Sequence, residues 1–455
     1  MGVGDTIAAV ATPPGEGGIG IIRVSGPDSI QIVERIFHGK KPLSQGRNRE
    51  MQYGLIKDGE GQAIDEVLAV VMGAPRSYTR EDVVEIHCHG GMAPLRRILE
   101  LVLAGGARLA EPGEFTKRAF LNGRLDLSQA EAVMDVIRAH SDRGLQLAID
   151  QLRGTLGRRV TALRGDLLGV LAELEARLDF PEEDIPLADR ERTARILKEC
   201  AARIADLLAG FKGGRALREG VRTVIVGRPN VGKSTLLNTL LGEDRAIVTS
   251  IPGTTRDVIE EVILIAGVPV RLVDTAGIRQ GLDEAERLGV ERSRQQAARA
   301  DLILLVIDGS VPLEEEDWLL MGEAAGREAI VLINKGDLPQ RTLPEDVKAH
   351  LPCAPLLKVS LKEGWGLDEL KKTIYDQVVG QGLEGVMVAN LRHAKALEEA
   401  LAAVKGAAEA LDRGLSDELI CVDVRAALTA LGKITGESVD GDLLDEIFSR
   451  FCLGK

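Results

Sequence analysis

The chain has 455 residues, of which 45% are hydrophobic and 28% are charged, and its formal net charge is −13. This length favours about three domains, each large enough to bury its own core. The acidic balance argues against a chain whose main task is to grip nucleic acid by its phosphates, since like charges repel. Any contact with RNA would therefore need a local basic patch or a partner.

The five cysteines are odd in number and no two have C-x-x-C spacing, so neither a disulfide framework nor a zinc site is indicated. The N-terminus lacks a basic region followed by an apolar run, and no segment approaches the roughly 20 apolar residues that span a bilayer. We therefore expect a reduced, cytoplasmic location and no membrane partner.

The first 122 residues combine short apolar runs with glycine and proline, which predicts an α+β domain. Its expected strands are Ile19–Val24, Val67–Met72 and Val83–His87, and its expected helix is Leu95–Leu103. From Leu127 the hydrophobic pattern changes to that of helices, because leucines and valines recur at helical spacing as far as Leu178. A second helix is expected from about Ala188 to Phe211.

The pattern changes again between residues 221 and 375, where short β-rich runs are separated by helical stretches. This alternation predicts a doubly wound α/β domain. The six runs are Val224–Val226, Ile259–Ile265, Val270–Val273, Leu302–Ile307, Ile330–Ile333 and Leu356–Val359. Because helical sequence flanks this region on both sides, we predict a helical domain in two parts (123–217 and 383–455) with the α/β domain (218–382) inserted between them. The alternative is two unrelated helical domains.

The segment Gly227-Arg-Pro-Asn-Val-Gly-Lys-Ser234 matches the P-loop pattern and lies between an apolar strand and an apolar helix, as that pattern requires. Its glycines let backbone N–H groups close on phosphate oxygens, and the helix N-terminus adds partial positive charge. We expect Lys233 to reach the β- and γ-phosphates and the Ser234 hydroxyl to bind Mg²⁺.

Further motifs of a GTPase follow in the correct order. Asp274-Thr-Ala-Gly277 ends a strand, where an Asp can hold Mg²⁺ through water, and Thr254 and Thr255 precede it in a polar loop. Asn334-Lys-Gly-Asp337 ends the strand Ile330–Ile333. Its Asp can accept hydrogen bonds from the N1–H and 2-amino groups of guanine, which adenine does not offer. Ser360 follows the next strand and backs the base. The set predicts a GTPase.

Position 278 is Ile, where many GTPases carry a Gln that orients the attacking water. An apolar side chain cannot orient water, so another group must do so. Arg279, Glu284, Glu286 and Arg287 lie just downstream and are the candidates. A solvated helix face is the alternative explanation for these charges.

Several segments together resemble the MnmE (TrmE) family of bacterial tRNA-modification GTPases. They are Asn230, Gly253-Thr-Thr-Arg-Asp257, Asp274-Thr-Ala-Gly-Ile278, the terminal Phe451-Cys-Leu-Gly-Lys455, Ala11-Thr-Pro-Pro-Gly15, Pro112-Gly-Glu-Phe115 and Leu125-Asp-Leu127. The resemblance covers the whole chain. It implies a multidomain protein with an α+β N-terminal folate-binding and dimerising domain, a discontinuous all-α helical domain, and an inserted Ras-like α/β P-loop GTPase domain.

The resemblance also implies roles for residues in the GTPase domain. K⁺ would be held by Asn230, Thr249, Ile251 and Thr254, and Mg²⁺ by Ser234 and Thr255. A monovalent cation between the phosphates can supply the charge that an arginine finger provides elsewhere. Glu286 would orient the attacking water when two GTPase domains meet, and Arg256 is a further catalytic candidate. The expected GTP contacts are Asn230, Val231, Gly232, Lys233, Ser234, Thr235, Thr249, Ser250, Ile251, Pro252, Gly253, Thr254, Thr255, Asp274, Thr275, Ala276, Gly277, Asn334, Lys335, Asp337, Ser360, Leu361 and Lys362.

The same resemblance places a one-carbon derivative of tetrahydrofolate (5,10-methylene or 5-formyl) against Arg23, Glu85, Arg124 and Lys455. Glu85 can accept hydrogen bonds from pterin N–H groups, while Arg and Lys suit the glutamyl carboxylates. The family often has Lys at the position of Arg124, which changes contact geometry. Cys452 is a candidate catalytic thiol; a buried structural cysteine is the alternative.

The implied reaction adds a carboxymethylaminomethyl or aminomethyl group to C5 of the wobble uridine (position 34) of certain tRNAs. A homodimer of the chain would act with MnmG (GidA), in a heterotetramer or larger complex, and MnmG would contribute FAD and much of the tRNA surface. Which tRNAs are modified stays open, as does whether the basic stretch Arg153, Arg158, Arg159 and Arg164 contacts tRNA or is a solvated face. The competing functions are a ribosome-assembly GTPase switch and a folate enzyme with a degenerate GTPase domain.

Two further patterns are weak. Gly15-Glu-Gly-Gly-Ile-Gly20 has the spacing of a dinucleotide-binding loop, but it precedes a strand and opens no helix. His87-Cys-His89 places two imidazoles on one face of a strand, yet no further ligands are evident. We expect neither to bind a cofactor.

Overall fold

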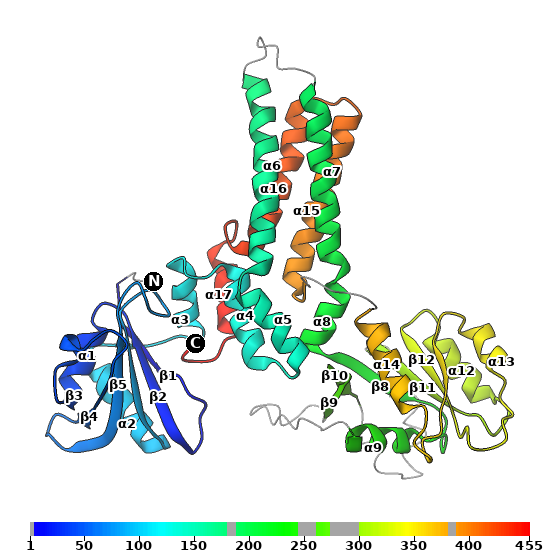
Figure 1. The fold of residues 1–455 in the computed structure, drawn as a ribbon, viewed down its shortest axis with the longest axis horizontal. Coiled ribbons are helices and arrows are strands. Elements are labelled where there is room, and N and C mark those ends of the chain that lie inside the picture. Colours follow the sequence, from blue (N-terminus) through cyan, green and yellow to red (C-terminus); the bar gives the residue numbers. More distant parts are fainter. Residues whose placement is uncertain (1–3, 180–187, 244–260, 274–299, 381–387) are drawn as a thin grey trace. The chain divides into compact units, whose positions relative to one another are not determined.

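A computed structural model of the chain describes residues 4–179, 188–243, 261–273, 300–380 and 388–455 (Figure 1). The expected site residues Thr249–Arg256, Asp274–Gly277 and Glu286 lie outside these ranges. The chain divides into two compact units. One comprises residues 1–134, 151–162 and 429–455, and the other comprises 135–150 and 163–428.

A seven-stranded sheet forms most of the first unit, with strand order β3-β4-β5-β6-β2-β1-β7. Its strands are β1 (Ile7–Val10), β2 (Gly17–Ser25), β3 (Phe37–Gly39), β4 (Met51–Lys57), β5 (Ala63–Met72), β6 (Val83–Gly90) and β7 (Arg108–Leu109). Neighbouring strands are antiparallel, apart from the parallel pair β1 and β7. The predicted strands and the predicted helix Leu95–Leu103 are confirmed, each within a slightly longer element.

One face of this sheet is covered by α1 (Ser29–Ile36) and α2 (Met92–Ala104), as Figure 1 shows. Ile22, Ile86 and Ile98 are fully buried in the core between them. Along β4 exposure alternates, with Gln52, Gly54 and Ile56 buried and Met51 and Tyr53 exposed. This period of two is what a strand shows when only one of its faces is packed. The remaining helical elements are η1 (Leu43–Gln45) and α3 (Glu114–Leu121).

Long helices follow the N-terminal sheet and return after the α/β domain. They are α4 (Leu127–Arg138), α5 (Asp142–Leu152), α6 (Thr155–Asp179), α7 (Ala188–Ala209), α8 (Phe211–Glu219), α15 (Leu391–Asp412), α16 (Asp417–Thr435) and α17 (Gly441–Ser449). The leucines expected on one face of α6 are buried, among them Leu163, Leu167 and Leu174. Helix α15 packs along α7, so chain segments before and after the insertion lie side by side.

Helix α8 was not predicted, because Gly213 and Gly214 oppose helix formation. The structure gives the reason for these glycines. A Cβ at Gly213 would lie 2.5 Å from the carbonyl oxygen of Val379, and one at Gly214 would lie 2.5 Å from that of Val388. The two glycines therefore allow the chain that leaves the α/β domain to pass directly against the helix that enters it.

The inserted domain contains a six-stranded sheet of order β13-β12-β11-β8-β10-β9. The strands are β8 (Val221–Val226), β9 (Glu261–Ile265), β10 (Val268–Leu272), β11 (Leu302–Asp308), β12 (Ala329–Asn334) and β13 (Leu356–Lys358). All neighbours are parallel except β9 and β10. The predicted doubly wound sheet is thus confirmed, with one antiparallel edge strand.

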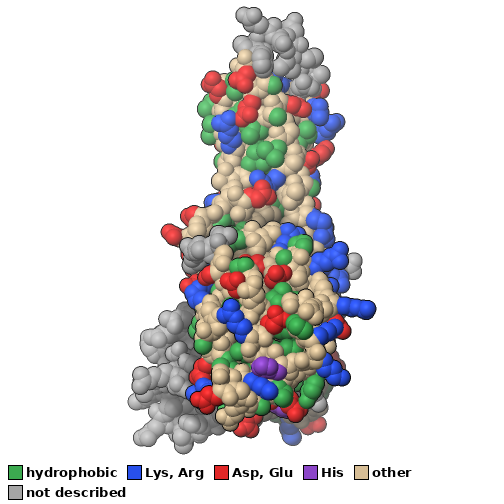
Figure 2. Space-filling view, turned by 90° about the vertical axis from the view of Figure 1, so that its left-hand side faces the viewer, with side chains coloured by type: hydrophobic (Ala, Val, Ile, Leu, Met, Phe, Trp, Pro, Cys, Tyr) green, Lys and Arg blue, Asp and Glu red, His purple; other side chains and the backbone are tan. Residues whose placement is uncertain are grey.

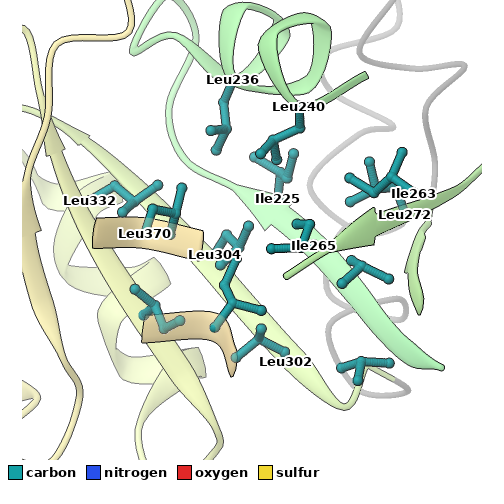
Figure 3. Close-up of a cluster of buried hydrophobic side chains, with 14 of the residues drawn as sticks. Ile225, Leu236, Leu240, Ile263, Ile265, Leu272, Leu302, Leu304, Leu332 and Leu370 are labelled. Atoms are coloured by element: carbon teal, nitrogen blue, oxygen red, sulfur yellow. The ribbon is translucent and has the colours of Figure 1, made fainter. Parts of the chain in front are cut away.

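Helices cover both faces of this sheet. They are α9 (Lys233–Glu243), α12 (Glu315–Ala324), α13 (Pro344–His350) and α14 (Leu367–Val378). Leu236 and Leu240 of α9 and Leu370 of α14 pack on one face (Figure 3), and Met321 of α12 and Val347 of α13 pack on the other. Strands β11 and β12 are buried along their whole length, which explains their unbroken apolar sequences. Because the strands are parallel, the segments that follow β8, β11, β12 and β13 meet at one edge of the sheet.

Candidate functional site

The P-loop follows β8 and leads into α9 at Lys233. The ammonium group of Lys233 donates to the carbonyl oxygens of Gly227 at 2.6 Å and Arg228 at 2.7 Å, so the loop curls around its own lysine. Asn230 has a φ of 59° and Gly232 a φ of 112°, both in the left-handed region. Left-handed residues in such a loop allow successive N–H groups to point at one anion, the arrangement that binds phosphate at a helix N-terminus. Ser234 and Thr235 lie in the first turn of α9.

A feature of the P-loop that the sequence did not reveal is an ion pair at Arg228. Its guanidinium lies 2.8 Å from the carboxylate of Asp317 and 2.5 Å from that of Glu314, at the start of α12. Asp317 is 1% exposed, so this pair is shielded from water on the Asp317 side. Arg228 therefore fastens the P-loop to the sheet's flanking helix.

Asn334 connects the P-loop to the base-binding loops. Its side-chain amide donates to the carbonyl oxygen of Val231 at 2.7 Å, and its side-chain oxygen accepts from the Leu361 amide at 3.1 Å. A Cβ at Gly232 would lie 2.3 Å from the Asn334 side-chain nitrogen, so only glycine allows this approach. Lys335, whose φ is 60°, pairs with Asp308 at 2.5 Å. Asn334, the Asn of the predicted guanine motif, thus holds the P-loop and the loop at Leu361 together.

Asp337 is oriented by the predicted backing loop, since the Ser360 hydroxyl donates to its carboxylate at 2.6 Å. That hydrogen bond lowers the pKa of Asp337 below its usual value of 3.8. The exposed carboxylate is therefore charged at neutral pH and ready to accept hydrogen bonds from a base. The structure brings together the P-loop, Asn334–Asp337 and Ser360–Lys362, while the expected contacts between 249 and 286 lie outside the described residues.

A second cluster of predicted residues lies in the N-terminal sheet. Arg23 of β2 pairs with Glu85 of β6 at 2.8 Å and also donates to the carbonyl oxygen of Gly454 at 3.0 Å. Lys455 is partly buried, and the pKa of its ammonium is lowered, first by burial and then by the nearby Arg23. Arg124 donates to the carbonyl oxygen of Tyr78 at 2.8 Å.

Tyr78 connects the two arginines of this cluster and was not predicted. The Arg23 guanidinium lies 5.5 Å and the Arg124 guanidinium 4.6 Å from the centroid of its ring. Its hydroxyl is 2.9 Å from the Thr116 hydroxyl, and the Phe115 ring lies 5.7 Å from Arg23. Both arginines are thus held by cation–π contacts. We call Arg23, Tyr78, Glu85, Arg124 and Lys455 the N-terminal basic cluster.

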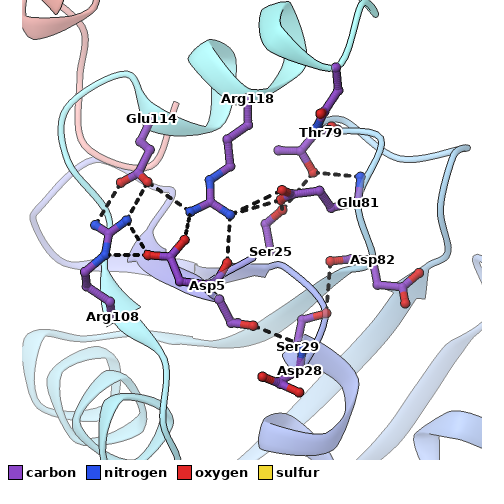
Figure 4. A network of polar contacts seen from close by, with 12 residues as sticks. Asp5, Ser25, Asp28, Ser29, Thr79, Glu81, Asp82, Arg108, Glu114 and Arg118 are labelled. Carbon is purple, nitrogen blue, oxygen red and sulfur yellow. Dashed lines mark hydrogen bonds and ion pairs between the residues drawn. The ribbon is translucent and has the colours of Figure 1, made fainter. Parts of the chain in front are cut away.

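A network of ion pairs fixes α3, which carries Phe115 and Thr116, against the sheet (Figure 4). Glu114 accepts from Arg108 at 2.7 Å and from Arg118 at 3.0 Å, and Asp5 accepts from both arginines. Burial alone would raise the pKa of Glu114, but these hydrogen bonds outweigh it and hold the pKa below 4.5. The network positions α3 and therefore the cluster beside it.

The C-terminal residues follow a defined path along this unit. The carbonyl oxygen of Cys452 accepts from the Gly113 amide at 3.4 Å. Gly454 has a φ of 83°, and a Cβ there would lie 2.4 Å from the carbonyl oxygen of Val10. Glycine is therefore required where the chain passes β1 and reaches Arg23. Cys452 itself is exposed, unlike the buried structural cysteine that was its alternative.

The two weak patterns, His87-Cys-His89 and the glycines between 15 and 20, are accounted for by contacts within the N-terminal sheet. His87 contacts Glu85 at 3.4 Å, and His89 pairs with Asp65 at 2.6 Å. Cys88 is buried, which raises the pKa of its thiol to about 11. Within the described ranges, no three His, Cys, Asp or Glu side chains form a group that could hold a metal ion. Gly17 and Gly20 belong to β2.

The basic stretch lies around the start of α6. Arg153 and Arg158 line a cavity of about 460 Å³ together with Asp126 and Gln129, and Arg158 donates to the carbonyl oxygen of Arg153 at 2.7 Å. Arg159 is exposed and Arg164 is partly buried. No helix in the described part of the chain is long and apolar enough to cross a membrane.

The strand order, the P-loop and the guanine-type loop at one sheet edge define a P-loop GTPase with a Ras-like fold. The family description "GTP-binding protein TrmE N-terminus" matches residues 6–124, and "MnmE helical domain" matches residues 127–452. Proteins called "tRNA modification GTPase MnmE" are 51% identical in Heliobacterium modesticaldum, 50% in Lactiplantibacillus plantarum and 49% in Geobacter sulfurreducens. These matches cover 99–100% of this chain and 98–100% of each relative.

The chain therefore belongs to the MnmE family, and it is a GTPase of tRNA modification. The predicted multidomain fold class and the predicted family are both confirmed.

Proposed function

We propose that this GTPase uses a one-carbon derivative of tetrahydrofolate, 5,10-methylene or 5-formyl, bound at the N-terminal basic cluster. The observation that carries the proposal is that Glu85 and Lys455 lie beside Arg23, while Arg23 and Arg124 share the ring of Tyr78. These residues come from β2, β6, the segment after α3 and the C-terminus, and a purely structural ion pair would not need all four.

The donors and acceptors of this cluster suit folate. Glu85 has one carboxylate oxygen on Arg23 and the other 3.4 Å from His87, so it can accept hydrogen bonds from pterin N–H groups. Arg124 and Lys455 can pair with glutamyl carboxylates, and an anion bound beside Lys455 would offset the burial and the Arg23 charge that lower the pKa of its ammonium group. When bound, the folate would supply the one-carbon unit.

We propose that the GTPase site binds Mg²⁺ and K⁺. Ser234, in the first turn of α9, has the position of a Mg²⁺ ligand, and Thr255 would complete the pair. Asn230, at the tip of the P-loop, would hold K⁺ with Thr249, Ile251 and Thr254. Glu286 would orient the attacking water, with Arg256 nearby. The roles of residues 249–286 rest on the family alone.

We propose a homodimer through the open face of the N-terminal sheet. Met51, Tyr53 and Leu68 are 50%, 58% and 40% exposed there, and Tyr53 and Leu68 are direct cross-strand neighbours. The same face continues through Val70 to Glu85. An apolar strip beside a ligand-binding cluster is typical of an interface that helps to enclose the ligand.

The proposed reaction adds a carboxymethylaminomethyl or aminomethyl group at C5 of the wobble uridine (position 34) of certain tRNAs, in the cytoplasm. MnmG would be the partner, in a heterotetramer or larger complex, and would contribute FAD and much of the tRNA surface. Figure 2 supports this division of labour, because Lys and Arg are interleaved with Asp and Glu over the face drawn. A chain of net charge −13 needs help to hold a polyanion.

The folate proposal is tested by calorimetry with 5-formyl-tetrahydrofolate on the full-length protein. Binding should occur with the wild type and be lost with Arg23→Ala, while Arg76→Ala, at an arginine outside the cluster, should leave it unchanged. The modification role is tested by nucleoside analysis of tRNA from cells that lack the protein. An unchanged amount of the C5 group at the wobble uridine would refute it.

A further inference from the structure

The side chain of Trp365 lies against the loop that carries Asp337. A Cβ built on Gly336 would lie 2.4 Å from Cη2 and 2.6 Å from Cζ2 of the indole. The ring thus fills the space that a side chain at position 336 would occupy. The backbone of Gly336 is not in the left-handed region, so φ does not require glycine here. The indole is the closest obstacle to a side chain, and the carbonyl oxygen of Val359, 3.1 Å from such a Cβ, is the next.

Trp365 is also joined to the loop that carries Ser360. The Ser360 amide donates to the carbonyl oxygen of Trp365 at 3.1 Å, and the Gly364 amide donates to that of Ser360 at 2.8 Å. These bonds close a tight turn around Ser360, whose hydroxyl holds the Asp337 carboxylate at 2.6 Å. One residue therefore contacts both loops of the base pocket, the first through its ring and the second through its backbone.

Packing alone does not account for this tryptophan. Its side chain is 44% exposed, whereas the large residues of the neighbouring core, Leu370 and Ile374, are fully buried. A tryptophan that is about half exposed and packs on a glycine buries less apolar surface than a tryptophan in the core, so it stabilises the fold less. What it does contribute is restriction of Gly336, the most flexible residue type, next to the carboxylate that reads the base.

We propose that Trp365 is a positioning residue for guanine recognition. It restrains Gly336 and the turn at Ser360 so that the Asp337 carboxylate is held in the orientation that accepts both the N1–H and the 2-amino group of guanine. Preorganisation of this kind raises affinity by reducing the entropy lost on binding. The inference rests on the proposed assignment of Asp337 as the guanine acceptor.

The first test compares GDP with inosine diphosphate, which lacks the 2-amino group, on the full-length protein. Trp365→Ala should weaken GDP binding by roughly tenfold and inosine diphosphate binding by much less, since the second hydrogen bond depends most on orientation. Trp365→Phe should recover most of the difference. Trp318→Phe, which changes the ring that stacks on His350 4.4 Å away, should leave both affinities unchanged. Equal weakening of both nucleotides by Trp365→Ala would mean a merely structural role and would overturn the proposal.

The second test is a double-mutant cycle between positions 336 and 365. Gly336→Ala should weaken GDP binding in the wild type, because the new methyl group displaces the indole. In the Trp365→Ala background only the carbonyl oxygen of Val359, 3.1 Å from the new Cβ, remains close, so the same change should have a much smaller effect. Additive effects would refute the proposed contact. A wild type that binds ADP as tightly as GDP would instead refute the assignment of Asp337 itself, so the two failures are distinguishable.

Discussion

We expect base selection to depend on the carboxylate of Asp337, the proposed guanine acceptor. It accepts from the Ser360 hydroxyl and is exposed. Asp337→Asn replaces an acceptor by an amide that donates to the 2-oxo group of xanthine. We expect the affinity for GTP to fall about 100-fold, the loss of two hydrogen bonds to a charged group, and xanthosine triphosphate to bind instead. Competition between the two nucleotides measures this, and unchanged preference for GTP would contradict it.

Tyr78 is expected to matter through its ring. Tyr78→Ala removes the surface on which Arg23 and Arg124 rest, and we expect 5-formyl-tetrahydrofolate to bind about tenfold more weakly, with GTP turnover unchanged. Tyr78→Phe removes only the hydrogen bond to Thr116 and serves as the matched control. Calorimetry on both variants decides between ring and hydroxyl. If the Phe variant loses as much affinity as the Ala variant, the cation–π argument is wrong.

At this scale the sequence predicted residues that belong to contiguous motifs, such as Lys233 and Asp337. It did not predict Tyr78, Arg228 or Trp365. Their roles depend on partners that are distant in sequence or that carry no motif of their own. Tyr78 contacts Arg23 on β2 and Arg124 beyond the end of α3, and Arg228 pairs with Asp317 at the start of α12. The signal for Trp365 was its place between Gly364 and Gly366, which no periodicity distinguishes from an ordinary turn.

The P-loop is the element in which backbone geometry is most restricted. Gly232→Ala places a Cβ 2.3 Å from the Asn334 amide at a φ of 112°, so the link between the P-loop and the guanine loop must break. We expect nucleotide binding to fall at least 100-fold. Gly242→Ala is the control. Gly242 lies in α9, the helix that follows Gly232, and a Cβ at Gly242 meets nothing within 4 Å. Fluorescent GDP titration of both variants tests this, and equal effects would contradict it.

The position of α3 is expected to depend on pH through Glu114. Because the pKa of Glu114 is lower in the folded protein than its usual 4.5, its contribution is fully present above about pH 4.5 and is lost as the pH falls through the folded value. Glu114→Gln should remove about 2 kcal/mol of local stability near neutral pH and weaken the acid dependence. Hydrogen exchange of β1 amides measures both effects. Glu111→Gln, at an exposed side chain, should change neither.

Elements were predicted well where a pattern repeats and poorly where a contact overrides propensity. The buried strands β11 and β12 and the leucine face of α6 followed directly from their sequences. Helix α8 did not, since its two glycines are explained only by the chain that returns past them at Val379 and Val388. Local sequence cannot carry that information.

The chain combines an N-terminal sheet domain with a helical domain into which the GTPase domain is inserted. The insertion was predictable because the hydrophobic period changes on entry and returns on exit. The boundaries at 122, 217 and 382 stay predictions. The two compact units divide within helices, at residue 134 of α4, 150 of α5, 162 of α6 and 428 of α16. The hydrophobic period of a sequence changes where the type of secondary structure changes, so it carries no information on how continuous helices divide between two compact units.

The absence of Gln at position 278 has a consequence for the intact protein. If K⁺ supplies the charge at the phosphates and Glu286 orients the water, GTP turnover by the full-length protein should be at least tenfold faster in K⁺ than in Na⁺. Glu286→Ala should abolish that difference while GDP still binds. Glu284→Ala, a carboxylate two residues away, should behave like the wild type. Equal turnover in the two salts would show that the cation has no catalytic part. Equal loss of turnover in the Glu286→Ala and Glu284→Ala variants would show that hydrolysis recruits a group other than Glu286.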